Sequence, residues 1–492
     1  MNGSGIVSIK TENKIYKNFI NGSWVEKNEV YEVTNPADKN EIVGKFPLAN
    51  EEDVNDAVQS AHNALQTWRK VPASERASYI YRFIELLDQN KERLAKALTQ
   101  EQGKPLTEAL TEVTRGVSEM RFVAGEAVRL DGITLPSDRR GVINMSVRVP
   151  IGVVAAITPW NFPVLTPLRK VVPALVCGCT VVLKPATDSP LTSVIITELL
   201  EEAGVPAGTV NLLLGNGRRV GEALVSHPLV KGVSFTGSTQ VGRSINETAA
   251  KNLTKVQLEL GGNNPVVVAD YKDLESAATQ IVGGCFGNAG QRCTAIKRVI
   301  VLDKHAEELE KYLIEKVENL KVGNGLNSET NIGPIVSEGA RNTLNEYMEI
   351  AKKEGANILL GGRNLTEGEY ESGYYFEPTV ISGVTPDMVV AKEEIFGPVL
   401  TIIRVSSIEE AIEISNNTEY GLTAAVFTDN MNWAYRFMED VESGMIHINN
   451  GTVSEGHMPF GGVKNSGLGP FSIGGTNKDF YTELKVTYIQ HQ

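Results

Sequence analysis

Between Ile151 and Leu260 the sequence alternates short apolar runs with helical segments. The runs are Val153-Val-Ala-Ala-Ile-Thr158, Thr180-Val-Val-Leu-Lys184, Val210-Asn-Leu-Leu-Leu214, Gly232-Val-Ser-Phe-Thr236 and Lys255 to Leu260. Helices are expected to begin near Pro163, Leu191, Arg218 and Thr239. Continuous apolar strands that alternate with helices predict a parallel sheet covered on both faces. Ligands of such sheets bind at the carboxyl ends of the strands.

Polar residues and glycines stand at these predicted carboxyl ends. They form the segments Thr158-Pro-Trp-Asn161, Lys184-Pro-Ala-Thr187, Gly215-Asn-Gly217 and Thr236-Gly-Ser238. The last segment opens a helix, so backbone N–H groups and the helix dipole favour an anion there. Gly237-Ser-Thr-Gln-Val-Gly242 is not GxGxxG, and a glycine turn by itself needs no ligand. The segments together nevertheless predict a nucleotide site.

A glycine-rich stretch follows, Gly283-Gly-Cys-Phe-Gly-Asn-Ala-Gly-Gln-Arg-Cys-Thr-Ala295. Its glycines allow tight turns and a close approach of the backbone to a ligand. Cys293 stands beside Arg292, and a positive neighbour lowers the pKa of a thiol and favours the nucleophilic thiolate. The alternative is a buried, inert cysteine. Cys285, eight residues earlier, is assigned to packing.

The remaining chain surrounds this region with further elements. Residues 16–48 read as short strands, with a hairpin signal at Asn21-Gly22. Helices are expected over 51–69, 74–101, about 105–128, 306–320 and 338–354, and strands at 265–268, 299–302 and 399–403. Alternating residues over 132–149 predict a two-stranded arm. The strand-like tail, Glu483 to Ile489, is expected to join that arm or the sheet of another subunit.

Composition excludes several classes of protein. The 492 residues are 41% hydrophobic and 22% charged, as in ordinary globular proteins. A net charge of −13 argues against nucleic acid or an anionic membrane as partner. The four cysteines include no CxxC pair and indicate neither a disulfide framework nor a metal site, which fits a reducing cytoplasm. Met1 to Lys14 lacks an apolar signal core, and no apolar run is long enough to span a membrane.

Two further residues complete a reactive constellation. Glu259 ends a predicted strand, and a carboxylate near a thiol acts as a general base, although a lone glutamate is usually a solvated charge. Asn161 offers an amide donor of the type that stabilises an oxyanion.

Six motifs resemble the aldehyde dehydrogenase superfamily over nearly the whole chain. They are Thr158-Pro-Trp-Asn-Phe-Pro163, Phe235-Thr-Gly-Ser238, Leu258-Glu-Leu-Gly-Gly262, Gly290-Gln-Arg-Cys293, Glu393-Glu-Ile-Phe-Gly-Pro398 and Pro459-Phe-Gly-Gly462. The resemblance implies a Rossmann-like cofactor domain over 1–130 and 150–261 and a second α/β catalytic domain over 262–463. It also implies a small β oligomerisation arm over 131–149 with a tail over 478–492, which pair across subunits into homodimers or homotetramers.

The same resemblance implies a mechanism. The Cys293 thiolate attacks an aldehyde, and Asn161 and the Cys293 N–H hold the oxyanion. Hydride passes to the nicotinamide, and Glu259 activates the water that hydrolyses the thioester. Glu259 also argues against the coenzyme-A-acylating branch. A non-catalytic member of the fold would lack these residues, and all three are present.

The cofactor is expected to be NADP rather than NAD. Many NAD-specific members carry a glutamate three residues after the lysine at 184, where this chain has Thr187. Threonine tolerates a 2′-phosphate, Lys184 can pair with it, and Arg218 and Arg219 add positive charge. The expected cofactor-binding residues are Thr158, Pro159, Trp160, Lys184, Thr187, Gly217, Gly237, Ser238, Leu260, Glu394 and Phe396.

The substrate is expected to be a small polar aldehyde. Eight residues after Asn161 the chain has Arg169, and in this it resembles family members that act on succinic semialdehyde or lactaldehyde. An arginine that faces the pocket favours a substrate with hydroxyl or carboxylate groups. The alternative is that Arg169 pairs with a structural carboxylate.

The runs 290–298 and 447–450 resemble non-phosphorylating glyceraldehyde-3-phosphate dehydrogenases, whose phosphate-binding arginines match Arg292 and, less directly, Arg115. Ser454 replaces another of those arginines, which favours glyceraldehyde, oxidised to glycerate. The alternative substrates are succinic or 2-oxoglutarate semialdehyde, and glyceraldehyde 3-phosphate in the non-phosphorylating reaction.

Overall fold

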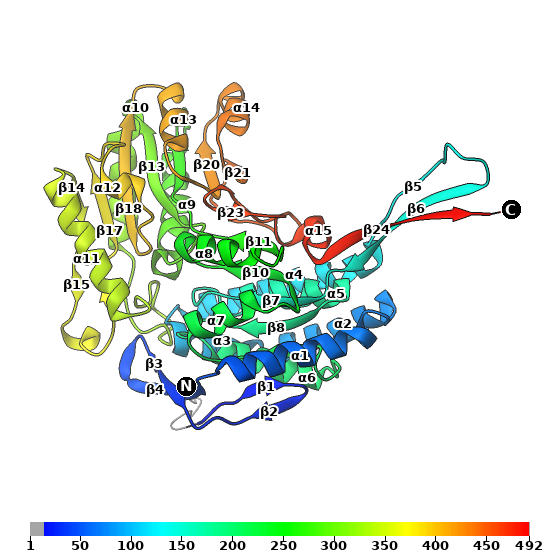
Figure 1. The fold of residues 1–492 in the computed structure, drawn as a ribbon. Helices are drawn as coiled ribbons and strands as arrows, with labels where there is room; N and C mark the ends of the chain where they lie inside the picture. Colours follow the sequence, from blue (N-terminus) through cyan, green and yellow to red (C-terminus); the bar gives the residue numbers. More distant parts are fainter. Residues whose placement is uncertain (1–13, 492) are drawn as a thin grey trace.

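The computed structural model describes residues 14–491 and contains two large sheets and a projecting arm (Figure 1). The first sheet has eight strands in the order β2-β1-β9-β8-β7-β10-β11-β23. The five strands from β9 to β11 are parallel, as predicted, and the flanking β1 and β23 are antiparallel to them. In the order of the sheet the strands are Ser23–Val25, Asn18–Ile20, Val210–Leu212, Thr180–Lys184, Val153–Ile157, Val230–Thr236, Lys255–Glu259 and Gly467–Leu468.

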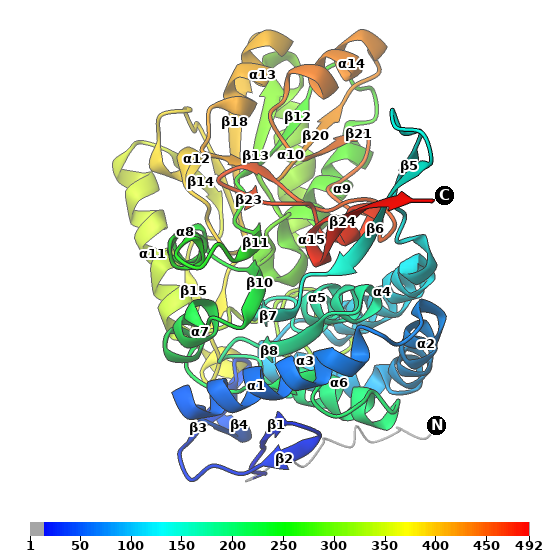
Figure 2. The same cartoon turned by 45° about the vertical axis from the view of Figure 1, so that its right-hand side comes forward.

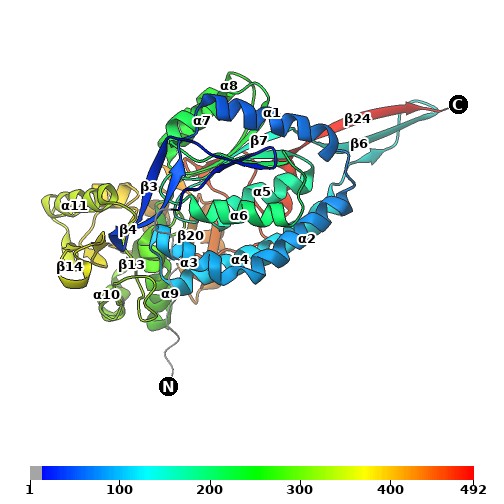
Figure 3. The same ribbon diagram turned by 90° about the horizontal axis from the view of Figure 1, so that it is seen from below.

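Helices cover both faces of this sheet. On one face lie α1 (Glu51–Trp68), α7 (Gly217–Ser226) and α8 (Thr239–Ala250), seen in front of the sheet in Figure 2. On the other lie α5 (Leu165–Cys177) and α6 (Leu191–Glu202), backed by α2 (Ala73–Gln89), α3 (Lys91–Gln102) and α4 (Leu106–Gly125) (Figure 3). Alternate residues of β7 therefore enter different cores, and all five are buried. This two-sided burial explains the continuous apolar runs.

The second sheet has seven strands in the order β14-β17-β18-β13-β12-β20-β21. All neighbours are parallel except β14 and β17. In that order the strands are Asn357–Leu360, Thr379–Ser382, Val399–Val405, Ile296–Leu302, Asn264–Val268, Thr423–Phe427 and Met445–Ile448. Its helices are α9 (Leu274–Phe286), α10 (Asp303–Glu318), α11 (Glu338–Lys353), α12 (Val389–Lys392), α13 (Ile408–Asn416) and α14 (Met431–Asp440).

A third, three-stranded sheet forms the arm that projects from the body in Figure 1. It consists of β5 (Thr134–Leu135), β6 (Val142–Pro150) and β24 (Thr482–Gln490), preceded by α15 (Asn477–Tyr481). The tail strand β24 pairs antiparallel with β6 over nine residues, so the tail joins the arm of its own chain. Short pairs complete the fold: β3 (Val30–Asn35) with β4 (Asp38–Pro47), β15 (Asn364–Leu365) with β16 (Tyr375–Phe376), and β19 (Tyr420–Gly421) with β22 (Val463–Lys464).

Two helix predictions need correction. The helix expected over 74–101 is divided at Asn90, which has φ −101° and ψ 12° and whose side-chain amide donates to the Leu86 carbonyl. Such a local side-chain bond competes with helix continuation. The helix expected to reach Val128 ends as α4 at Gly125 and continues as a 3₁₀ turn, Glu126–Arg129.

The N-terminal stretch that was judged from sequence to lack a signal core lies, up to residue 13, outside the described residues. Within residues 14–491, no helix combines the length and the apolar character needed to cross a membrane. The same residues contain no group of three His, Cys, Asp or Glu side chains arranged for a metal ion.

Candidate active site

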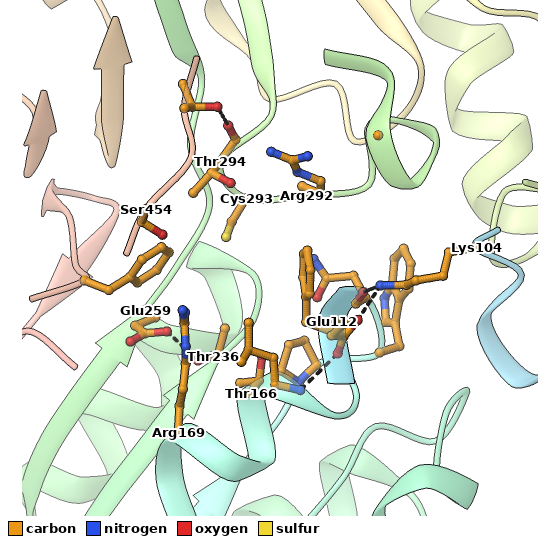
Figure 4. Close-up of a pocket in the computed structure, with 18 of the residues that line it drawn as sticks. Lys104, Glu112, Thr166, Arg169, Thr236, Glu259, Arg292, Cys293, Thr294 and Ser454 are labelled. Atoms are coloured by element: carbon orange, nitrogen blue, oxygen red, sulfur yellow. Dashed lines mark hydrogen bonds and ion pairs between the residues drawn. The ribbon is translucent and has the colours of Figure 1, made fainter. Parts of the chain in front are cut away.

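A cavity of about 640 Å³ lies between the two large sheets (Figure 4). Its wall comes from the carboxyl ends of β7, β10 and β11, from α4, from the loop after α9, and from segments near residues 394–396 and 452–460. The wall contains most of the predicted site residues: Pro159, Trp160, Asn161, Arg169, Gly237, Ser238, Glu259, Leu260, Arg292, Cys293, Glu394 and Phe396. Parts of the chain far apart in sequence therefore meet at one place.

The loop that carries Cys293 has an unusual backbone. After α9 ends at Phe286, Asn288, Ala289 and Gly290 adopt φ values of 54°, 53° and 68°. Left-handed conformations cost energy in residues other than glycine and persist where the surrounding structure holds them. At Gly290 a Cβ atom would lie 2.0 Å from the Gly397 carbonyl oxygen, so only glycine fits there.

Buried side chains hold this loop in place. Asn288 Nδ2 donates to the carbonyls of Asn161 and Gln291, both at 3.2 Å, and its Oδ1 accepts from Gln102 Nε2 at 2.9 Å. Gln291 Oε1 in turn accepts the Val336 N–H at 2.9 Å. Because these polar groups are buried and paired, the network fixes the loop relative to the first sheet.

The Cys293 thiol is half-buried in the cavity wall, whereas Cys177, Cys179 and Cys285 are buried. Burial raises the pKa of Cys293 to about 12, the carboxylates of Glu259 and Glu394 add to this rise, and Arg169 and Arg292 oppose it. The prediction from sequence that Arg292 produces a low thiol pKa is therefore wrong for this state of the site. Burial in a cavity with two carboxylates outweighs the two guanidinium groups.

The backbone N–H of Cys293 is available as a hydrogen-bond donor. Asn264 Nδ2 donates to the Cys293 carbonyl at 2.7 Å, while the Cys293 N–H has no hydrogen-bond acceptor within the part of the chain that the structure describes. An N–H group in this situation is suited to an oxyanion at the reacting carbon.

Asn161 lies four residues after the end of β7 and is buried. Its Nδ2 donates to the Gln291 carbonyl at 3.0 Å, two residues before Cys293. An amide NH₂ has two hydrogens, so a second donor is left for the cavity that Asn161 lines.

Glu259 is the last residue of β11 and faces the same cavity (Figure 4). Its Oε2 accepts from Thr236 Oγ1 at 3.1 Å, whereas Oε1 is buried without a hydrogen-bond partner in residues 14–491. A carboxylate oxygen that is buried and unpaired has its acceptor capacity free, as activation of a water molecule requires.

Arg169 lines the cavity but is already paired. Its Nε and one terminal nitrogen each lie 2.8 Å from a different oxygen of Glu119. Arg115 reaches the same carboxylate through Nε at 2.7 Å and donates to Ser454 Oγ at 2.9 Å. Two guanidinium groups thus share the carboxylate of Glu119, and Glu259 is a second negative neighbour of Arg169.

Arg292 is the least paired of the cavity arginines. Its Nε is buried without a hydrogen-bond partner among the described residues, and Glu108 and Arg115 act on its charge in opposite directions. Glu108 is itself engaged, because its Oε2 accepts the Asn288 N–H at 2.8 Å. In Figure 4 Arg292 lies on the same side of the cavity as Cys293 and Thr294.

Four predicted cofactor residues lie outside the cavity wall, at neighbouring strand ends. The Thr158 N–H donates to the Lys184 carbonyl, and Thr187 Oγ1 donates to the Gly215 carbonyl at 3.3 Å. A Cβ atom on Gly217 would lie 3.7 Å from Lys184 Nζ, so the ammonium lies at the start of α7. A helix N-terminus beside an ammonium favours a phosphate, and these residues fit the adenosine end of a dinucleotide.

The other end of such a dinucleotide would face Cys293. Trp160 and Phe396 pack edge to face at 5.6 Å between ring centroids, and Glu394 Oε1 accepts the Gly262 N–H at 3.0 Å. Burial raises the pKa of Glu394 to about 7. Ser238 caps the N-terminus of α8, whose amides point into the same region.

Sequence reasoning missed several residues of the site. Glu119, Lys104 and Glu112 lie on or behind the cavity wall, and Asp188 lies next to Thr187 and attracts Lys184. Glu112, Arg115 and Glu119 recur at three- and four-residue spacing on one face of α4, which is a signal visible in the sequence. Nothing in the sequence indicates which partner that face meets.

Comparison with known proteins identifies relatives over almost the full chain. Residues 24–487 match the model of the aldehyde dehydrogenase family. The chain is 42% identical to the alpha-ketoglutaric semialdehyde dehydrogenase of Bacillus subtilis (strain 168), over 98% of this chain and 100% of the relative. It is 39% identical to the NADP(+) succinate-semialdehyde dehydrogenase GabD of Escherichia coli (strain K12), over 92% of this chain and 93% of the relative.

Solved structures agree with this similarity. A crystal structure described as an E. coli NADP dependent enzyme matches with a TM-score of 0.94 and 37% sequence identity. The match covers 97% of this chain and 98% of that chain.

Proposed function

Because the chain belongs to the aldehyde dehydrogenase family, and is therefore an oxidoreductase acting on aldehydes, we propose that its substrate is a semialdehyde carrying a carboxylate. The best candidate is 2-oxoglutarate semialdehyde, followed by succinic semialdehyde. The observation that carries this proposal is Arg292, whose guanidinium lines the cavity with its Nε unpaired within residues 14–491. A buried guanidinium gains most from a carboxylate, because charge-assisted bonds are the strongest available.

Two further observations support an anionic substrate. Arg115 and Arg169 share the single carboxylate of Glu119, so this cluster of three side chains carries more positive than negative charge, although Glu259 also acts on Arg169. The two relatives described above are named for the semialdehydes of alpha-ketoglutarate and succinate. Glyceraldehyde, favoured from sequence alone, is uncharged and has less support than these alternatives.

In the proposed reaction the Cys293 thiol, after loss of its proton, attacks the aldehyde carbon. The Cys293 N–H and the second N–H of Asn161 receive the oxyanion, which lowers the barrier to its formation. Bound NADP would accept the hydride that leaves the reacting carbon, and this loss turns the adduct on Cys293 into a thioester. Glu259 then takes a proton from water as that water attacks the thioester, releasing the acid and the thiol.

The proposal is tested by kcat/KM for 2-oxoglutarate semialdehyde, succinic semialdehyde, glyceraldehyde, glyceraldehyde 3-phosphate and the neutral aldehyde butanal. The carboxylate-bearing semialdehydes should give the highest values. A highest value with glyceraldehyde, its phosphate or butanal would refute the substrate class while leaving aldehyde oxidation intact.

Arg292→Met is expected to raise KM for the preferred semialdehyde about 10- to 100-fold, with a much smaller effect on butanal. The reason is that a hydrogen bond to a charged group contributes about 1.5–3 kcal/mol. Steady-state kinetics with both substrates measure the difference. Equal losses for both aldehydes would show that Arg292 serves the loop rather than the substrate.

Gly287 offers a milder version of the same experiment. A Cβ atom there would lie 2.8 Å from an Arg292 terminal nitrogen, so Gly287→Ala displaces the guanidinium without removing it. The control is Gly339→Ala in the first turn of α11, which does not line the cavity and where the nearest heavy atom to an added Cβ is Ser337 Oγ at 3.9 Å. Only the alanine at 287 should raise KM for the semialdehyde.

We further propose that NADP is preferred over NAD. Three features support this preference: the ammonium of Lys184, which lies near the start of α7, the exposed Arg219 in the first turn of that helix, and the absence of a carboxylate at Thr187. Asp188, the next residue, opposes it through its attraction for Lys184. The wild-type enzyme should therefore show the higher kcat/KM with NADP, and an equal or higher value with NAD would contradict the proposal.

Thr187→Glu is expected to lower kcat/KM with NADP about 10- to 100-fold and to change the value with NAD far less. A carboxylate near a 2′-phosphate costs about 1–4 kcal/mol at surface dielectric values. The ratio of the two kcat/KM values measures the shift. Thr187→Gln, which has the same shape without the charge, is the control.

We also propose that the chain forms homo-oligomers through its arm. The projecting sheet exposes Ile143, Val147, Leu484, Val486 and Tyr488, and exposed strands with apolar side chains favour pairing. Light scattering should give a mass of at least two chains at micromolar concentration. Leu484→Lys with Val486→Lys should reduce that mass, and a monomeric wild-type protein would refute the proposal.

A further inference from the structure

Lys104 and Glu112 form an ion pair that is closed to solvent in the cavity wall. The Lys104 ammonium lies 2.7 Å from Glu112 Oε2, and each side chain is only 2% exposed. Lys104 follows α3 and Glu112 lies in α4, so the pair joins two helices beside the end of β7. Figure 4 shows the pair across the cavity from Arg169. The proposed reaction assigns neither residue a role.

Among residues 14–491, the other polar contacts of the two side chains go to one segment, residues 161–165. Lys104 Nζ donates to the Asn161 carbonyl at 2.8 Å and lies 4.3 Å from the centroid of the Phe162 ring. Glu112 Oε1 accepts the N–H groups of Val164 and Leu165 at 3.0 and 2.9 Å, where α5 begins. The pair therefore holds this segment at both ends.

The held segment contains the proposed oxyanion donor. The direction of the Asn161 side chain follows from the orientation of its peptide, which Lys104 and Asn288 both bind through the carbonyl. A donor misplaced by about 1 Å loses much of its effect on a developing charge. Lys104 thus acts on the backbone that carries the amide, while the Gln291 carbonyl accepts from the amide itself.

Stability alone accounts poorly for such a pair. Removing two charges from water offsets most of their mutual attraction, so a buried ion pair is often replaceable by neutral residues without loss of stability. The pair instead contributes a defined geometry, because an ammonium held by a fixed carboxylate donates its hydrogen bonds in a fixed direction.

We propose that Lys104 and Glu112 are positioning residues that orient the Asn161 amide toward the oxyanion formed at Cys293. The inference rests on the proposed oxyanion role of Asn161. It predicts that the pair acts on the reaction through Asn161 and not independently of it.

The test is a double-mutant cycle that measures kcat for propanal oxidation. Lys104→Met with Glu112→Gln removes both charges, while the glutamine oxygen can still accept the Val164 and Leu165 N–H groups. This neutral pair should fold and should lower kcat about tenfold or more. In an Asn161→Ala background the same two changes should lower kcat by less than about twofold, because the donor that they position is already gone.

Alkylation of Cys293 by iodoacetamide separates positioning from general disruption. Alkylation forms no oxyanion, so the neutral-pair variant should be alkylated within about twofold of the wild-type rate. Lys27→Met, which removes the partner of Asp53 at the start of α1, is a control for the loss of an ion pair. It should lower the melting temperature without lowering kcat in either background.

Each outcome decides the matter. The inference would be overturned if the neutral pair lowered kcat by the same factor in the Asn161→Ala background as in the wild type. It would also be overturned if the alkylation rate of the neutral-pair variant fell as far as its kcat. A neutral pair that keeps full kcat beside an impaired Asn161→Ala would overturn the positioning role alone. An unimpaired Asn161→Ala would refute the oxyanion role and the positioning role together. If the neutral pair does not fold, Glu112→Gln alone enters the same cycle with the same expectations.

Discussion

Cys293→Ser is expected to lower kcat for aldehyde oxidation by at least about 10³-fold. A serine hydroxyl at this position remains protonated at every accessible pH, and an alcohol without an adjacent base is a poor nucleophile. Within residues 14–491 no histidine lines the cavity, and the proposed reaction uses the Glu259 carboxylate to take a proton from water, not from the nucleophile. The absorbance of reduced nicotinamide measures the rate, and retention of a tenth of wild-type kcat would refute the assignment of the nucleophile.

The raised pKa of Cys293 sharpens this prediction. With the pKa near 12, the thiol is protonated at neutral pH, and the thiolate fraction grows about tenfold for each pH unit up to about pH 11. The iodoacetamide reaction should therefore accelerate steadily from pH 7 to pH 10, without a plateau, and should be lost in Cys293→Ser. A plateau by pH 8 would show that the free enzyme already holds a thiolate.

Glu259→Gln is expected to stop the reaction after its first half. The amide cannot take a proton from water, so thioester hydrolysis should slow about 10²- to 10⁴-fold while attack by Cys293 proceeds. Rapid mixing with aldehyde and NADP should give a burst of one reduced nicotinamide per active site, followed by a slow steady state. Intact mass spectrometry of the quenched protein should detect the acyl group on Cys293.

Thr236→Val provides the matched control for Glu259. It removes the one hydrogen bond that the Glu259 carboxylate accepts within residues 14–491, from Thr236 Oγ1, but leaves the carboxylate in place. Its effect on the steady state should be much smaller than that of Glu259→Gln, and no acyl enzyme should accumulate. An equally slow Thr236→Val, or a Glu259→Gln variant without a burst, would contradict the role of Glu259 as the base for water.

The first, eight-stranded sheet is the part of the fold most accessible to sequence reasoning. Its central strands are buried on both faces, so they read as uninterrupted apolar runs, and their parallel order follows from the helices between them. The antiparallel strand β23 was not predicted, because two residues, Gly467–Leu468, carry no periodicity. The break at Asn90 was missed for a similar reason, since one side-chain bond to Leu86 outweighs a continuous helical pattern.

In the site, too, local motifs were recognisable from the sequence, whereas contacts between distant residues were not. Cys293, Glu259 and Asn161 stand in recognisable motifs, and the structure brings them to one cavity, although their roles remain predictions. The charge at Cys293 was misjudged because Arg292 is its neighbour in sequence, whereas Glu259 and Glu394 become its neighbours in space. Arg169 was expected to face the substrate or to pair with a carboxylate, and it does line the cavity while paired with Glu119.

The sequence by itself determined the fold class, the family and the chemical type of the reactive groups. These properties depend on local patterns and motifs, which short stretches of chain carry without reference to their surroundings. Only the tertiary structure decided which charges face one another: two carboxylates beside the thiol, one glutamate shared by two arginines, and a buried lysine on the Asn161 carbonyl. Electrostatic effects depend on distance and burial, and neither is a property of spacing along the chain.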